Sequence, residues 1–160
     1  MTFNHFDEKG HAIMVDVSAK GATLRKAVAA AVVRMKPETL RAITEGRIVK
    51  GDVLAVARLA GITAAKRTSD LIPLSHPLAI HHAAVDFHPD ADKGEIRVES
   101  TIRAFERTGV EMEAMVSASV AALTIYDMCK GSDKGISINE VALISKEGGK
   151  SGTYRRTDTA

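Results

Sequence analysis

The chain has 160 residues, 45% hydrophobic and 26% charged, which excludes a disordered chain and predicts one folded domain with its own core. Its net charge of +2, its pI of about 8.7 and its 4% of aromatic residues argue against a dedicated nucleic-acid-binding protein and suit small anionic ligands. The single cysteine, Cys129, excludes an intrachain disulfide, and the lack of a signal-peptide core or of a run of about 18 apolar residues predicts a cytoplasmic protein outside the membrane.

The first third of the chain holds one ambiguous segment between two clearer ones. Alternating apolar residues at 13–17 predict a short extended segment. Residues 22–35 are rich in alanine, which favours a helix, yet their larger apolar side chains also recur with the period of two that is typical of a strand. Composition therefore leaves helix and strand open there. A short helix is predicted to begin at Pro37 and to end at Gly46.

The middle of the chain predicts a second helix followed by a rigid connection. Asp52 is a suitable N-cap for a helix whose apolar spacing continues to Gly61. One or two further helical turns are expected at 64–67. Two prolines within residues 71–77 exclude a regular helix, so this segment should be a fixed loop that holds its side chains in place.

The second half predicts a hairpin, a long helix and a last strand. Residues 80–88 and 94–105 are β-type stretches joined by a polar loop. Residues 111–130 contain no Gly or Pro, begin with acidic residues and precede Gly131, a candidate C-cap. Because this helix is apolar on nearly every face, we expect a sheet and a second subunit to cover it. A final, bulged strand is expected at 136–144.

The two ends of this single domain, which spans 1–160, are expected to be mobile at 1–12 and 148–160. Gly149-Lys150-Ser151 is similar to the end of a phosphate-binding P-loop. That loop needs a glycine where Ile144 stands and a helix afterwards, so a P-loop is disfavoured. A Gly-Lys segment that closes on a phosphate stays open as an alternative.

Several polar residues are candidates for chemistry. Asp127 and Lys130 lie three positions apart on the long helix, so the carboxylate can hold the ammonium, although most such pairs are solvated surface pairs. A zinc site is disfavoured because His81 and His82 would point to opposite faces of a strand. Two rival functions are weighed: a non-catalytic nucleotide- or RNA-binding oligomer, and a metal-dependent GTP ring-opening hydrolase, for which the sequence offers no ligand set.

Four strings in fixed order make the chain resemble a known family: MVDVSAK, KGDVLAVARLAGITAAKRTSDLIPLSHPL, TGVEMEAMVSASVAALTIYDMCK and GGKSG. They closely resemble the MoaC family of cyclic pyranopterin monophosphate synthases, from about Asp16 to Gly152. The resemblance implies an α+β domain with a ferredoxin-like antiparallel sheet packed on helices. It also implies a homohexamer, a trimer of dimers with active sites shared between subunits. On this basis residues 22–35 are expected to be a strand.

The resemblance further implies a small-molecule substrate, 3′,8-cyclo-7,8-dihydro-GTP, converted to cyclic pyranopterin monophosphate and pyrophosphate without a metal or organic cofactor. Matching the family's strings makes Asp127 the active-site acid. Substrate-lining positions carried over in the same way are Leu74, Ser75, His76, Met112 and Glu113. Lys50, Lys66, Lys130, Asp16 and Glu111 also fall on family site positions. The family often has Cys where this chain has Ser75, and commonly Leu where it has Met115; both changes are small.

Chemical roles can be assigned to these positions as hypotheses. Lys50 and Lys130 are expected to form an acid/base pair, with Asp127 orienting Lys130 and with Lys66 helping to lower the lysine pKa values toward neutrality. His76 should hydrogen-bond the substrate, and Glu113 should pair with N–H donors of the guanine-derived ring. The fourteen positions from 113 to 127 span about 21 Å of straight helix, so one pocket that uses both needs two copies of the helix.

Overall fold

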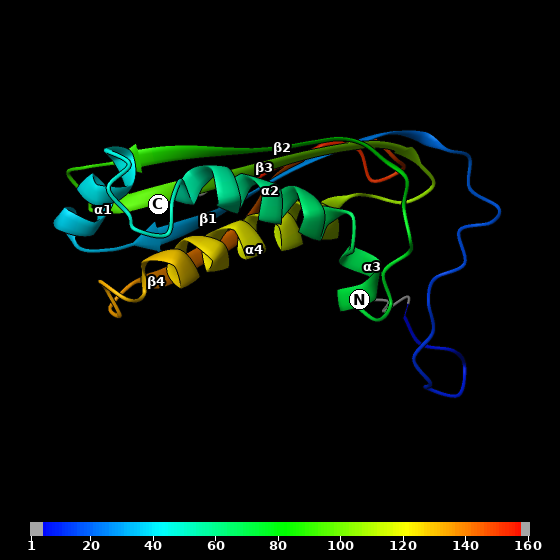
Figure 1. Cartoon of the computed structure of the whole chain (residues 1–160). Helices are drawn as coiled ribbons and strands as arrows, with labels where there is room; N and C mark the ends of the chain where they lie inside the picture. The colour runs from blue at the N-terminus through cyan, green and yellow to red at the C-terminus, as the bar shows by residue number, and fades with distance from the viewer. Residues whose placement is uncertain (1–4, 158–160) are drawn as a thin grey trace.

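The computed structural model describes residues 5–157, in which helices cover one face of a five-stranded antiparallel sheet (Figure 1). The strands are β1 (Thr23–Arg34), β2 (Ile80–Asp90), β3 (Glu95–Glu106), β4 (Ser137–Glu147) and β5 (Tyr154–Arg155). The helices are α1 (Pro37–Thr44), α2 (Val53–Ala65), α3 (Thr68–Leu71) and α4 (Glu111–Cys129). The sheet order is β2-β3-β1-β4-β5, which confirms the expected α+β class.

The ambiguous alanine-rich segment is a strand, β1, at the centre of this sheet. Ala27, Ala29, Ala31 and Val33 are fully buried and belong to the core beneath the helices. Their small side chains let α4 lie close to the sheet, so packing decides against the helix propensity of alanine. The ladder between β1 and β4 shifts register twice, which confirms the expected bulge.

Helices α2 and α4 lie side by side on the sheet and meet at a glycine (Figure 1). Asp52 caps α2 as predicted, accepting the N–H of Ala55 at 2.9 Å. The expected helix end at Gly61 is wrong, because α2 continues to Ala65. A Cβ at position 61 would lie 3.0 Å from the carbonyl oxygen of Ser117 on α4, so this glycine serves the close helix contact instead.

Three other boundaries differ from expectation. Residues 13–17 form no strand and belong instead to an arm, residues 5–22, whose only bridge joins Phe6 and Ala12. Strand β2 runs on through Pro89, which an edge strand tolerates because its outer N–H groups need no partner. Lys130, not Gly131, is the C-cap of α4.

The chain ends are partly described. Near the C-terminus the two-residue strand β5 pairs with β4. The mobility expected for 1–12 and 148–160 stays a prediction, and residues 1–4 and 158–160 lie outside the described part of the chain.

The free edge of β2 is occupied at its midpoint by an arginine from α2. Arg58 donates its Nε–H to the carbonyl oxygen of Val85 at 2.9 Å, and its guanidinium lies 5.5 Å from the ring centroid of Phe87. The N–H of Met35 donates to the carbonyl oxygen of Gly94, and in an antiparallel pair every second residue forms such bonds. Ser100, six residues after Gly94 on β3, therefore forms its backbone hydrogen bonds with β1. Val85, the partner of Ser100, therefore points its own carbonyl away from β3.

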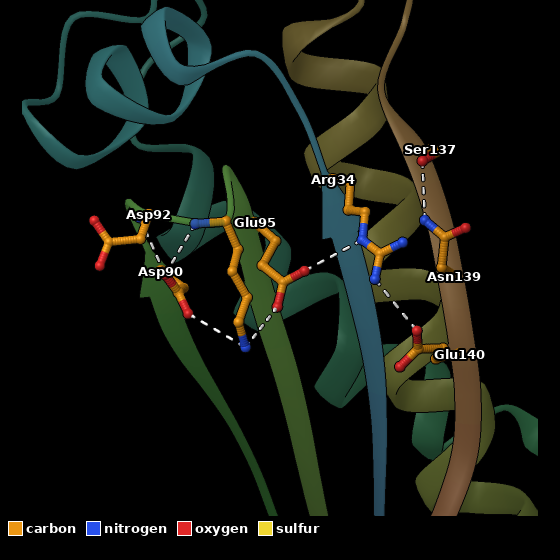
Figure 2. A network of polar contacts seen from close by, with 8 residues as sticks. Arg34, Asp90, Asp92, Glu95, Ser137, Asn139 and Glu140 are labelled. Carbon is orange, nitrogen blue, oxygen red and sulfur yellow. Dashed lines mark hydrogen bonds and ion pairs between the residues drawn. The ribbon is translucent and has the colours of Figure 1, made fainter. Parts of the chain in front are cut away.

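A polar network ties three strands together at the end of the sheet near α1 (Figure 2). Arg34 on β1 contacts Glu95 on β3 at 3.2 Å and Glu140 on β4 at 3.3 Å. Lys93 pairs with Glu95 at 3.9 Å and with Asp90 at 3.6 Å. Since Arg34 and Lys93 are largely exposed, each pair adds little stability, and the main consequence is a defined register at this end.

The buried carboxylate of Asp133 should be a large contributor to stability. Its side chain is 2% exposed and accepts hydrogen bonds from the N–H groups of Lys36 and Gly135 and from the hydroxyl of Thr39, at 3.0–3.1 Å. These bonds, led by that from Lys36, hold the pKa of Asp133 below its ordinary value. Asp133→Ala should therefore lower the free energy of unfolding by about 3 kcal/mol, measured in urea.

The pH dependence gives a control for this prediction. A lowered pKa in the folded state means that Asp133 stabilises the protein above the ordinary carboxyl pKa and that this contribution is lost as pH falls. The difference between wild type and Asp133→Ala should shrink as pH falls below the ordinary carboxyl pKa of 3.8. An equal difference at pH 2 and pH 7 would show that the charge is not the cause.

Candidate active site

One cavity of about 390 Å³ lies at the N-terminal end of α4. Three segments enclose it: the arm, the loop after α3, and the turn that leads from β3 into α4. Figure 1 shows the arm, in blue, at the α3 end of the molecule. The lining includes six predicted site residues, Leu74, Ser75, His76, Glu111, Met112 and Glu113. The structure therefore brings two distant sequence strings into one pocket, of a size typical for small-molecule sites.

Glu113 is the most unusual group in this cavity. It is 3% exposed, and its Oε2 has no hydrogen-bond partner. Burial raises the pKa of Glu113 to about 7, and the nearby charge of Glu111 adds to this effect. A buried carboxyl with an unpartnered oxygen in a cavity is suited to bind N–H donors of a ligand.

His76 lies in the cavity as predicted, but one of its ring nitrogens is already engaged. Nε2 lies 2.7 Å from the carbonyl oxygen of Val15 in the arm, so in the tautomer that satisfies this contact Nε2–H donates. Nδ1 is then the atom that a ligand can reach as an acceptor. The turn that carries His76 is fixed by the bond from the N–H of Ser75 to the carbonyl of Ile72.

Lys50, Asp127 and Lys130 form a second group, at the C-terminal end of α4. Lys130 donates to Oδ1 of Asp127 at 2.6 Å, as the hypothesis that Asp127 orients Lys130 requires. Lys50 reaches the same residue, donating to its carbonyl oxygen at 2.8 Å. The hydrogen bond from Lys130 lowers the pKa of Asp127. The same contact raises the pKa of Lys130.

The expected clustering of three lysines does not occur within one chain. Lys66 is the C-cap of α2 and lies near α3, at the other end of the helix pair from Lys50 and Lys130. The hypothesis that the lysines lower one another's pKa values is wrong for Lys130 in the single chain, because the carboxylate of Asp127 dominates its surroundings. Asp16 is exposed and lies between two cavity-lining residues of the arm, Val15 and Val17, without lining the cavity itself.

The two groups lie at opposite ends of one straight helix. The positions from Glu113 to Asp127 are all within α4, so they are separated by about 21 Å along its axis. The cavity and the lysine group therefore cannot act on one small ligand within a single chain.

Sequence reasoning did not single out several residues at the cavity. Lys20, Val15, Val17, His5, Leu78, Thr108 and Gly109 complete the lining. The carboxylate of Glu111 folds back against Gly109 and fills the space that a side chain at position 109 would need. A Cβ there would overlap Oε2 of Glu111. Lys146 pairs with Glu111 at 3.9 Å and donates to the hydroxyl of Ser151, which places the Gly-Lys-Ser-Gly segment beside this group. All seven except His5 lie within the strings that carry the family resemblance, which is the signal that could have found them.

The described residues show neither a metal-binding cluster nor a membrane-spanning helix. Residues 5–157 contain no cluster of three or more histidine, cysteine or acidic side chains placed to hold a metal ion. Among these residues there is also no helix with the length and apolar character needed to cross a bilayer.

Comparisons with known proteins cover nearly the whole chain. The model of the MoaC family matches residues 14–149. A protein named cyclic pyranopterin monophosphate synthase from Geotalea uraniireducens (strain Rf4) is 75% identical over 99% of both chains. A protein of the same name from Geobacter metallireducens is 69% identical over 100% of both chains. Another, from Rhodospirillum rubrum, is 57% identical over 94% of this chain and 90% of its own length.

Proposed function

Because the chain belongs to the MoaC family, we propose that it converts 3′,8-cyclo-7,8-dihydro-GTP into cyclic pyranopterin monophosphate and pyrophosphate, an early step of molybdenum cofactor biosynthesis. The observation that carries this proposal is identity over the full length to proteins with that name. The chemistry of the cavity agrees with it: carboxyl groups suit a guanine-derived ring, and lysines suit a triphosphate. The reaction takes place in the cytoplasm.

The proposed active unit is a homohexamer built as a trimer of dimers, in which each site joins the cavity of one subunit to the lysine group of another. The separation of the two groups along α4 supports this sharing. Apolar side chains are also exposed on the helix layer, namely Val56, Leu59, Met112 and Leu123. Such a surface suits contact with a second copy. The order β2-β3-β1-β4, with β5 added at the edge, supports the ferredoxin-like arrangement.

The lysine group is proposed to act on the triphosphate. Closing the cyclic phosphate requires a substrate hydroxyl to attack the α-phosphorus while the bond to the β-phosphate breaks, so that pyrophosphate leaves. Lys130, kept protonated by Asp127, supplies positive charge and a proton to the leaving group. Lys50, whose Nζ donates to the carbonyl oxygen of Asp127 at 2.8 Å, is proposed as the partner that, in its neutral amine form, accepts the hydroxyl proton.

The cavity is proposed to hold the ring system. Glu113 offers an unpartnered oxygen to paired N–H donors, and Nδ1 of His76 can accept from a third. Leu74 and Met112 supply apolar contact with the ring, and Ser75 lies beside His76 on the fixed loop. Glu111 lines this half of the site, and Asp16, on the arm, and Lys66, at the C-terminal end of α2, are proposed to act on it through charge.

Turnover of the cyclised GTP tests the function. The wild-type protein should release pyrophosphate and give a product that oxidises to a fluorescent pterin. Lys50→Ala and Lys130→Ala should each lower turnover by about 1,000-fold while the assembly stays folded, because each removes a group that moves a proton. Lys134→Ala is the matched control and should keep full activity, since this exposed lysine beyond α4 makes no side-chain hydrogen bond or ion pair with any of residues 5–157. Unchanged turnover in both lysine variants would refute their role.

A further inference from the structure

Gly109, in the turn between β3 and α4, is a glycine for a reason that its own backbone does not supply. Its φ lies outside the left-handed region, so an L side chain would meet no backbone strain there. The obstacle to a side chain is the carboxylate of Glu111. The three atoms nearest to a Cβ at position 109 would be Oε2, Cδ and Oε1 of Glu111, with Cδ at 2.6 Å and Oε1 at 2.7 Å. Because nonbonded atoms do not approach so closely, a side chain at 109 and this position of the carboxylate exclude each other.

The turn that carries Gly109 is held too firmly to give way. Arg25 on β1 donates to the carbonyl oxygens of Glu106 and Arg107, each at 3.2 Å. The guanidinium of Arg107 in turn donates to a backbone carbonyl of the arm at 2.8 Å. By contrast, the carboxylate of Glu111 is the far end of a flexible side chain that can change rotamer. An alanine at 109 should therefore displace the carboxylate and leave the backbone in place.

In its folded-back position the charge of Glu111 is balanced by groups of the protein itself. Nζ of Lys146 on β4, which is not part of the cavity lining, lies 3.9 Å from Oε1 of Glu111. This ammonium is largely buried and also donates to the hydroxyl of Ser151. The first turn of α4 contributes as well, because the N–H groups at a helix N-terminus favour a negative charge. The carboxylate is thus held without help from a ligand.

Displacing this carboxylate would change the cavity for a ligand. Gly109 and Glu111 both line the cavity, beside the buried Glu113. The cavity volume of about 390 Å³ is near the lower end of the range that is typical of small-molecule sites. A carboxylate pushed away from Gly109 and from Lys146 would occupy part of this volume and bring its negative charge into it. Both effects oppose the binding of an anionic ligand.

We propose that Gly109 is a positioning residue of the active site: it leaves the room in which the carboxylate of Glu111 folds back toward Lys146, and so keeps the cavity open to the anionic substrate. Gly109 acts through Glu111 and makes no contact of its own with the reacting atoms. This inference rests on the proposed function, because that function supplies the triphosphate-bearing substrate.

The test is a double-mutant cycle with Gly109→Ala and Glu111→Ala. Gly109→Ala should raise KM for the cyclised GTP by about 10-fold with kcat within about two-fold of wild type, because the displaced carboxylate opposes binding and not a chemical step. The double variant should match Glu111→Ala in both constants within about two-fold, since the added methyl group then has no carboxylate to displace.

Gly21→Ala is the matched control for the change from glycine to alanine. Gly21 also has a φ outside the left-handed region, and within residues 5–157 only its chain neighbours lie within 4 Å of a Cβ placed there. This variant should change neither constant. Circular dichroism should show the same melting temperature for Gly109→Ala as for wild type, so that loss of the fold is not the cause of a raised KM.

The outcomes separate this inference from the proposed function. A double variant whose KM is the product of the two single effects, or an unchanged KM in Gly109→Ala, would overturn the inference while wild-type turnover leaves the function standing. A crystal structure of Gly109→Ala gives a readout that does not depend on turnover. It should show the carboxylate of Glu111 inside the cavity and apart from Lys146. A carboxylate that stays beside Lys146 would overturn the inference even if the cyclised GTP proved not to be the substrate.

Discussion

A mixture of two inactive variants, Lys130→Ala and Glu113→Gln, is expected to regain about a quarter of wild-type turnover when the two chains are co-expressed. Each variant alone damages every site, since Lys130 and Glu113 belong to opposite ends of α4. In a mixed pair, one of the two shared sites takes Glu113 from the first chain and Lys130 from the second and is intact. Random pairing makes half of the pairs mixed. Because one of the two sites in each mixed pair is intact, a quarter of all sites are active.

The control for this experiment uses two defects in the same half of the site. Lys50 and Lys130 both contact Asp127 of their own chain, so they reach a shared site together. Co-expression of Lys50→Ala with Lys130→Ala should therefore restore no turnover. Two differently tagged chains, purified in sequence, guarantee that the assemblies measured are mixed. Equal recovery in both mixtures, or recovery in neither, would rule out a site divided along α4 in this way.

Glu113→Gln is expected to stabilise the ligand-free protein by about 2–3 kcal/mol at pH 8 while lowering turnover by about 100-fold. In the folded wild type, burial raises the pKa of Glu113 from 4.5 to about 7. The folded state therefore keeps a proton that the unfolded state has lost. The favourable contribution of this group is complete below pH 4.5 and is lost as pH rises through about 7. An amide carries no charge to bury.

Urea unfolding at a series of pH values measures this effect. The difference between variant and wild type should be small at pH 4 and should grow up to about pH 8. Glu106→Gln, the same carboxyl-to-amide change outside the cavity lining, is the matched control. A difference that does not change with pH would show that Glu113 is charged throughout, and that another group neutralises it.

The sequence was sufficient for the elements whose signals are local. The N-cap at Asp52, the helix that begins at Pro37 and the long helix from Glu111 were predicted because caps, proline and unbroken helix formers act within a few residues. Gly61 was misjudged because its reason is a contact with α4, far along the chain. Residues 22–35 were ambiguous for the same reason, since the small alanines are required by α4 above them.

The site was predictable where it lies within continuous strings, and less so where it depends on assembly in space. The residues around His76 and Glu113 were placed together by the resemblance, and the structure puts both in one cavity. The pairing of Asp127 with Lys130 followed from their spacing. Within one chain Lys66 lies at the other end of the helix pair from Lys50, so their grouping stays a prediction for a site shared between subunits. Arg107 gave no signal, since its partner is a backbone carbonyl.

The hydrogen bond from Arg58 to the carbonyl oxygen of Val85 affects how the chain avoids self-association while it folds. An open edge strand of 11 residues would otherwise template pairing with other copies. Arg58 reaches that carbonyl from α2, so protection begins only when this helix docks on the sheet. Refolding at high concentration should accordingly lose more material to aggregates in Arg58→Ala than in wild type, even where the native states are equally active.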